Sequence, residues 1–250
     1  MLIVILTALG VGGATVIGAL VGFLFKDISH KFSNLVVSFA AGIMLSAAVL
    51  GLVLPSIEYG GNWGVAVAVL GILVGGVCIN LSDRLVPHIQ KIAVRGEDSE
   101  RDRGKTRGVL LFVIAIGIHN LPEGIAAGVG FGSGDIESAL LIAAGIALHN
   151  IPEGMVIISP MLASGISPKK TFVFALITGL AEVAGTFVGY FAVSIASAIL
   201  PFALAFAGGA MLYVISEEMI PETHASSDEC RVTYAFLCGF CAMLVLDAVM

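Results

Sequence analysis

Two six-residue motifs place polar residues inside sequence that is otherwise apolar. The first, HNLPEG, covers residues 119–124, and the second, HNIPEG, covers residues 149–154. Residues four apart share one face of a helix, so the histidine and glutamate of each copy are expected side by side, with the asparagine nearby. Each copy thus predicts half of a metal site. The six candidate ligands are His119, Asn120, Glu123, His149, Asn150 and Glu153.

The ligand types narrow the choice of cation. Imidazole suits zinc, iron, copper and nickel, whereas carboxylate and amide oxygens also suit manganese. Neither motif contains a cysteine. We therefore expect a borderline divalent cation, with zinc first and iron, manganese, cobalt or cadmium as further candidates, and not copper(I).

A structural alternative is a pair of proline kinks whose polar residues bond between helices. Pro122 and Pro152 lack an N–H and press against the carbonyl four residues earlier, which kinks a helix. However, a charged side chain at the centre of a membrane helix costs about 2.5–3.5 kcal/mol on insertion scales. Apart from Lys170, at the first residue of the predicted span 170–196, no lysine or arginine lies within a predicted span, so none reaches mid-membrane depth to compensate the two glutamates. Protons, the histidines or a bound cation must therefore do so, which favours the metal site.

Other polar residues lie at membrane depth or just beyond it. Glu182 follows Lys170 by 12 residues, about 18 Å along a helix, and is predicted to join the site. Met44 reaches a similar depth, where it either packs or ligates. An acidic group after the seventh span is either a solvated loop or a relay that draws the cation into the cytoplasm. Its members are Glu217, Glu218, Glu222 and His224.

The composition identifies the elements that carry these residues as membrane helices. The chain is 58% hydrophobic and 12% charged, whereas soluble domains carry about 25% charged residues. Apolar runs of about 20 residues span a bilayer, and in lipid they must be helical. Eight spans are predicted, near residues 1–25, 34–55, 63–82, 109–131, 136–160, 170–196, 198–216 and 232–249.

The basic residues predict the orientation. With eight spans, all 12 lysines and arginines fall on one side, which the positive-inside rule assigns to the cytoplasm. Both termini would then be extracytoplasmic, and the membrane is expected to be the plasma (inner) membrane. The expected divisions are helices 1–3 at 1–83, a cytoplasmic loop at 84–108, helices 4–5 with the motifs at 109–160, and helices 6–8 at 161–250 with an acidic cytoplasmic loop at 217–231.

The paired motif within eight spans resembles the ZIP (Zrt-, Irt-like protein) family of divalent metal transporters. The resemblance covers essentially the whole chain. It implies that His119, Glu123, His149 and Glu153 hold the transported ion, and that Asn120, Asn150 and Glu182 complete an adjacent second position. It also implies an all-α 3+2+3 bundle with inverted-repeat symmetry, often a homodimer, which works by elevator-like alternating access.

The sequence therefore predicts a transporter that moves zinc or a similar divalent cation into the cytoplasm, not an enzyme. The expected partners are divalent metal ions and the lipid bilayer, without nucleic acid. Two alternatives remain: a membrane-embedded metalloenzyme, and a membrane protein with a static metal site. The enzyme would need a motif such as HExxH, which the chain lacks.

Overall fold

Membrane-length helices dominate the computed structural model, which describes residues 1–24, 29–93, 120–163, 165–224 and 229–249. These residues contain no strand. Seven helical stretches among them are long and apolar enough to cross a membrane: Leu2–Leu24, Lys31–Tyr59, Gly61–Ser82, Ile136–Ser159, Pro168–Ile195, Ser197–His224 and Cys230–Val249. The all-helical integral membrane fold is thereby confirmed. The 3+2+3 grouping stays a prediction.

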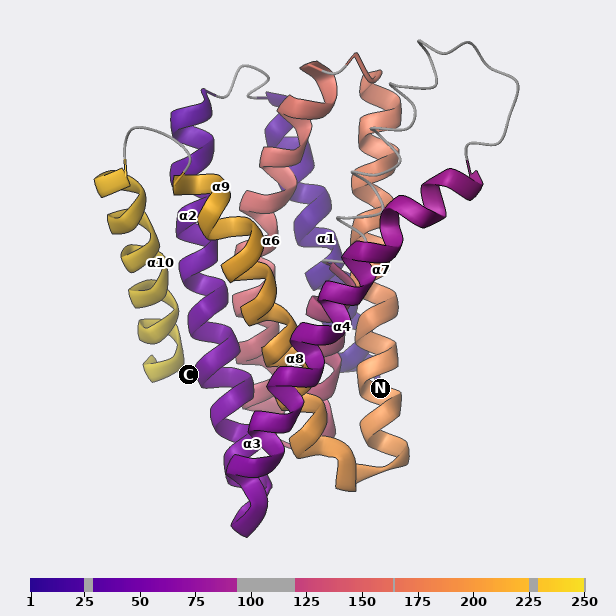
Figure 1. Ribbon diagram of the computed structural model, residues 1–250, viewed down its shortest axis with the longest axis vertical. Helices are drawn as coiled ribbons and strands as arrows, with labels where there is room; N and C mark the ends of the chain where they lie inside the picture. Colours follow the sequence, from indigo (N-terminus) through magenta and orange to yellow (C-terminus); the bar gives the residue numbers. More distant parts are fainter. Residues whose placement is uncertain (25–28, 94–119, 164, 225–228, 250) are drawn as a thin grey trace.

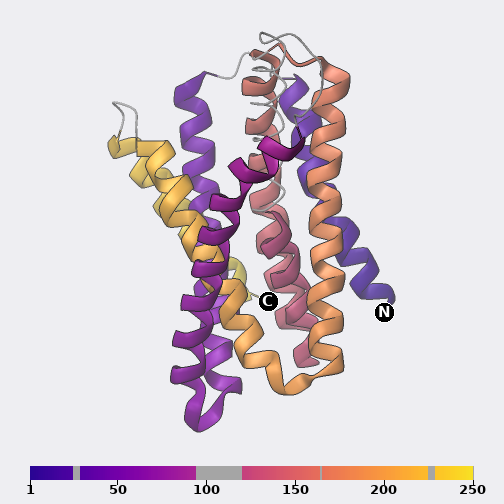
Figure 2. The ribbon, with the colours of Figure 1, turned by 45° about the vertical axis from the view of Figure 1, so that its right-hand side comes forward.

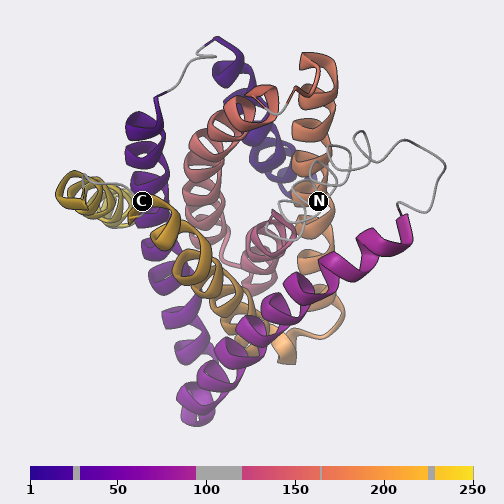
Figure 3. The same cartoon turned by 45° about the horizontal axis from the view of Figure 1, so that its top comes forward.

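The eighth predicted span, 109–131, is described only in its second half. Residues 120–130 are helical, and the 3-10 turn η3 (Phe131–Ser133) connects them to the next helix. Residues 109–119, including His119, and residues 94–108 of the predicted loop lie outside the described part of the chain. In Figure 3 the segment 120–130 lies inside the bundle.

The N-terminal helices are α1 (Leu2–Leu24), α2 (His30–Ser46), α3 (Leu54–Tyr59) and α4 (Gly64–Ala93). The π-helical turn η1 (Ala47–Val53) joins α2 to α3, and the 3-10 turn η2 (Gly61–Trp63) joins α3 to α4. Helix α4 crosses the bundle diagonally (Figure 1). It continues beyond the predicted end of the span at residue 82, because the charges that end a membrane span do not prevent helix formation in water.

The C-terminal helices are α6 (Ile136–Ala163), α7 (Pro168–Ile195), α8 (Leu200–Val214), α9 (Ile220–His224) and α10 (Glu229–Val249). The 3-10 turn η4 (Ser197–Ile199) precedes α8, and the π-helical turn η5 (Ile215–Met219) joins α8 to α9. Figure 2 shows α10 and α2 on one side of the bundle and α1 and α7 on the other.

Both π-helical turns come just before a proline. Pro55 follows η1 and Pro221 follows η5 by two residues. A proline cannot donate to the carbonyl four residues earlier and collides with it, so the helix widens there instead of breaking. Helix continues through His224, beyond the predicted end of the seventh membrane span at residue 216, so the acidic segment begins on a helix.

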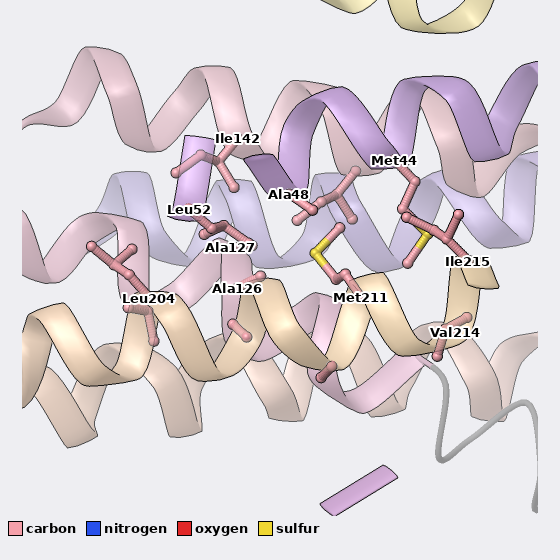
Figure 4. Close-up of a cluster of buried hydrophobic side chains, with 14 of the residues drawn as sticks. Met44, Ala48, Leu52, Ala126, Ala127, Ile142, Leu204, Met211, Val214 and Ile215 are labelled. Atoms are coloured by element: carbon pink, nitrogen blue, oxygen red, sulfur yellow. The ribbon is translucent and has the colours of Figure 1, made fainter. Parts of the chain in front are cut away.

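The apolar core lies where α2, η1, the segment 120–130, α6 and α8 meet. Figure 4 shows Met44, Leu52 and Ile142 facing Leu204 and Met211 across this cluster, and all five are buried. By contrast, α1, α4, α7 and α10 leave many large apolar side chains exposed. In water these exposed faces would be unfavourable, whereas in a bilayer they face lipid tails.

Candidate metal site

Three ionisable side chains from two helices converge in the middle of the bundle. The Nε2 atom of His149 lies 3.2 Å from Glu123 Oε1 and 3.6 Å from Glu153 Oε2. One ligand atom from each of the three residues lies within 4.8 Å of the others. Imidazole nitrogen and carboxylate oxygen are zinc ligands, so this group has the composition and spacing of a metal site.

The group is placed deep in the membrane span. His149 lies 13 residues after the first residue of α6 and 14 before the last. The side chains of Glu123 and His149 are 0% and 1% exposed, while that of Glu153 is 15% exposed. A negative charge in this position is unfavourable unless it is compensated, and a divalent cation would compensate both carboxylates at once.

A second polar group surrounds Glu182 on α7. Its Oε1 accepts hydrogen bonds from Thr15 Oγ1 and Asn120 Nδ2, and its Oε2 accepts one from Asn150 Nδ2, each at 2.5 Å. Asn150 Nδ2 also lies 3.3 Å from the carbonyl oxygen of Val11, to which it donates. All four side chains of this group are 0% exposed. Glu182 is therefore held by three donors that come from α1, α6 and the segment 120–130.

The final glycine of each motif allows these helices to approach. A Cβ at Gly124 would overlap the carbonyl oxygen of Glu182, and a Cβ at Gly154 would overlap that of Thr15. Close backbone approach through small residues is typical of helix packing in membranes. Each motif therefore contains both its polar residues and the glycine that brings it against a neighbouring helix.

His119 lies outside the described residues, and the other predicted site residues fall into three sets, namely two groups and the residues that belong to neither. Glu123, His149 and Glu153 form the first group, and Asn120, Asn150 and Glu182 belong to the second. Met44 is 1% exposed within the apolar cluster, beside Ile215 and Met211 in Figure 4. The other four, which lie on η5 and α9, belong to neither group: Glu217, Glu218, Glu222 and His224.

Sequence reasoning missed Thr15. A threonine in an apolar helix usually bonds to its own backbone, so its type alone gave no signal. A signal exists in the spacing: Thr15, Gly18 and Gly22 repeat the spacing of Glu182, Gly185 and Gly189.

Comparison with known proteins gives consistent matches. A family model described as "ZIP Zinc transporter" matches residues 94–247. The chain is 39% identical over 242 residues to "Zinc transporter GufA" of Myxococcus xanthus, covering 94% of each chain. It is 33% identical to "Zinc transporter ZIPB" of Bordetella bronchiseptica over 246 residues, which cover 94% of this chain and 77% of the relative. It is 30% identical to the human "Zinc transporter ZIP11", covering 94% of this chain and 93% of the relative.

Proposed function

Because the chain belongs to the ZIP zinc transporter family, we propose that it carries zinc across a membrane through the group formed by Glu123, His149 and Glu153. The observation that carries the proposal is the convergence of two buried carboxylates and an imidazole at mid-span. His119 precedes Asn120 in the first motif and is proposed as the fourth ligand from its position in the sequence.

A second cation position is proposed beside the first, with ligands from Asn120, Asn150 and Glu182. The amide oxygens of both asparagines are buried and accept no hydrogen bond from a described residue. A buried acceptor without a donor is costly, and a bound cation would satisfy it. Glu123 and Glu153 have carboxylates that can bridge the two positions.

Transport is proposed to run toward the cytoplasm, with both termini extracytoplasmic in the plasma (inner) membrane. This orientation rests on the 12 basic residues, all of which lie on one side of the membrane if the predicted spans are correct. The positive-inside rule assigns that side to the cytoplasm. Under it, the relay formed by Glu217, Glu218, Glu222 and His224 lies at the cytoplasmic end, and Met44 lines the path beside the site. The division into 1–83, 84–108, 109–160 and 161–250, the 3+2+3 grouping and a homodimer are proposed with it.

The orientation has a direct test. A cysteine at position 99, introduced in a background without the four native cysteines, should resist a membrane-impermeant thiol reagent in intact cells and react after permeabilisation. Reaction in intact cells would reverse the proposed direction. Native mass spectrometry of the detergent-solubilised chain separates the homodimer from the monomer.

Uptake of radioactive zinc into proteoliposomes tests the function itself. The purified chain should accumulate zinc above protein-free liposomes, and accumulation should saturate with zinc concentration. Competition by iron, manganese, cobalt and cadmium then ranks these proposed further substrates. Saturable binding without accumulation would instead support a static metal site. The metalloenzyme alternative is not favoured, since the matching relatives are named as transporters.

A further inference from the structure

Helices α1 and α7 carry the same pattern of residues at the metal site. Residues 15–22 read TVIGALVG on α1, and residues 182–189 read EVAGTFVG on α7. Valines and glycines recur at equivalent positions of the two octapeptides. The first residue differs: it is threonine on α1 and glutamate on α7.

The shared glycines make equivalent contacts. A Cβ at Gly18 would overlap the carbonyl oxygen of Ile151, and one at Gly185 would overlap that of Leu121. These two carbonyls belong to the residue after the asparagine in each motif. The next glycines repeat the relation, Gly22 against Met155 and Gly189 against Ile125. Helix α1 therefore packs on the second motif as α7 packs on the first.

Thr15 consequently stands on α1 where Glu182 stands on α7, and their side chains meet. Thr15 Oγ1 donates to Glu182 Oε1 at 2.5 Å, and both side chains are fully buried. The two helices are 167 residues apart in sequence at this contact. This hydrogen bond links α1, which packs on the second motif, to α7, which packs on the first.

The bond is unusual among the threonines of the described chain. The other fully or nearly fully buried threonines donate to a backbone carbonyl three or four residues earlier, as Thr178 does to Ala175; they are Thr171, Thr178, Thr186 and Thr223. The corresponding carbonyl for Thr15, four residues earlier, is that of Val11, which accepts from Asn150 instead. Thr15 therefore bonds to a neighbouring helix in place of a carbonyl of its own helix.

The acceptor capacity of Glu182 shows what the bond does. An ionised carboxylate has about four lone-pair sites, two on each oxygen. Thr15 and Asn120 occupy both sites of Oε1, whereas Asn150 occupies one site of Oε2. With respect to the described residues, Oε2 is thus the oxygen with capacity left for a cation.

We propose that Thr15 is a positioning residue of the second cation position, whose hydroxyl fixes Glu182 through Oε1 so that Oε2 is available to the metal. This inference rests on the proposed function, because it takes Glu182 as a ligand. It adds α1 to the elements that build the site and assigns a role to a residue outside both motifs.

The test compares five variants of the purified full-length chain: Thr15→Val, Thr15→Ser, Thr178→Val, Glu182→Gln, and Thr15→Val combined with Glu182→Gln. Equilibrium dialysis with radioactive zinc gives the stoichiometry and affinity of each, and uptake into proteoliposomes gives KM and the maximal rate. Losing one hydrogen bond to a charged group shifts an equilibrium by about tenfold. Thr15→Val should therefore weaken the second zinc about tenfold and raise KM, while Thr15→Ser returns both to within about threefold of the parent.

Thr178→Val is the matched control, since it removes a buried hydroxyl that bonds within its own helix. It should bind zinc as the parent does. In the Glu182→Gln background, Thr15→Val should add no further loss, because residues that act through one group are not additive. An independent further loss would show a structural role and overturn the proposal, as would parent-like binding by Thr15→Val alone.

Failure of the inference and failure of the proposed function give different results. A parent chain without zinc uptake refutes transport. A parent that transports, with Glu182→Gln reduced to one bound zinc and Thr15→Val unchanged, refutes the role of Thr15 alone. If Thr15→Val does not reach the membrane, Thr15→Ser decides: zinc affinity near that of the parent supports the hydroxyl, and a tenfold loss refutes it.

Discussion

The α1–α6 contact and the contact of α7 with the segment 120–130 are built alike but equipped differently. In each, a glycine after a polar residue packs against the residue that follows a motif asparagine. The polar residue is Thr15 in one contact and Glu182 in the other. The backbone arrangement is therefore repeated, whereas the carboxylate is present on one side only.

This difference separates two demands on the sequence. Helix crossings need small residues at fixed intervals, and both contacts keep them. Helix packing does not determine whether the polar residue at the contact is charged. Since every buried carboxylate must be compensated, a threonine in one copy limits the number of charges that the site has to hold when empty. It also supplies a donor to the carboxylate that remains.

The largest effect is expected from removing one carboxylate of either motif. Glu123→Ala and Glu153→Ala each delete a ligand of the first cation position, and each should abolish zinc uptake while the chain remains in the membrane. The measurement is initial uptake into proteoliposomes at saturating zinc. Glu137→Ala, which removes an exposed carboxylate in the first turn of α6, is the control and should transport as the parent does.

If the two motifs contribute equally, the two losses will match. Normal uptake by both variants would show that these glutamates are structural. Loss of zinc uptake in only one variant would show that the two motifs are not functionally equivalent. Transport would then not explain why their backbone contacts are alike.

The glycine contacts are expected to have the next largest effect, on stability. Gly18→Ala and Gly185→Ala place a methyl group against a backbone carbonyl on the neighbouring helix, and overpacking of this kind costs about 1–3 kcal/mol or more. Both should lower the melting temperature in detergent by similar amounts. Gly10→Ala, also on α1, meets nothing within 4 Å and should leave it unchanged or higher, because alanine favours helix over glycine.

Equal losses at Gly18 and Gly185 would support equivalent crossings. A variant that melts at the temperature of the parent would show that its helix pair moves apart easily to make room for the methyl group. The glycines would then repeat in the sequence without an equivalent role in packing.

The two motif asparagines offer a finer comparison. Asn150 donates to both Val11 and Glu182, and so connects α6 to α1 and α7, whereas Asn120 donates to Glu182. One net hydrogen bond contributes about 1 kcal/mol. Asn150→Ala should therefore destabilise the chain by about 1 kcal/mol more than Asn120→Ala. Detergent melting measures both; equal losses would mean that the bond to Val11 contributes little.

Much of this arrangement follows from the sequence alone. Apolar length predicts the seven described spans, and the four-residue spacing places His149 beside Glu153. The contact between Glu123 and His149 is expected because the two motifs lie at similar depth in the membrane. The buried charge of each motif's glutamate is unfavourable unless a neighbouring group or a cation compensates it. These predictions succeed because they depend on local periodicity and on the solvent.

Other features depend on contacts between distant segments and could not be predicted in this way. Predicting the hydrogen bond from Thr15 requires knowing which helix faces Glu182, and a single threonine in an apolar helix does not indicate this. The ends of α4 and α9 were also missed, because a hydropathy boundary marks where the membrane ends and not where the helix ends. Both π-helical turns depend on how a proline is accommodated, by widening or by a kink.

The smallest effect is expected outside the membrane, at the start of α6. Asp135 Oδ1 accepts from the backbone N–H groups of Glu137 and Ser138, and Oδ2 accepts from Ser138 Oγ. The hydrogen bonds from the hydroxyl and N–H of Ser138, and then from Glu137, lower the pKa of Asp135 below its ordinary value. Because this pKa is lower in the folded than in the unfolded chain, the ionised carboxylate stabilises the fold at pH values above the unfolded-state pKa. This stabilisation is lost as the pH falls through the folded-state pKa.

Asp135→Ala should lower the melting temperature slightly at neutral pH, and the difference from the parent should disappear as the pH falls below about 4. Zinc uptake at neutral pH should stay at the parent level, because the cap supports α6 far from the site. This variant is thus the converse of Glu123→Ala: stability changes and transport does not. A fall in uptake as large as that of Glu153→Ala would mean that the start of α6 is coupled to the metal site, and that the two motifs differ in how they are held as well as in what they bind.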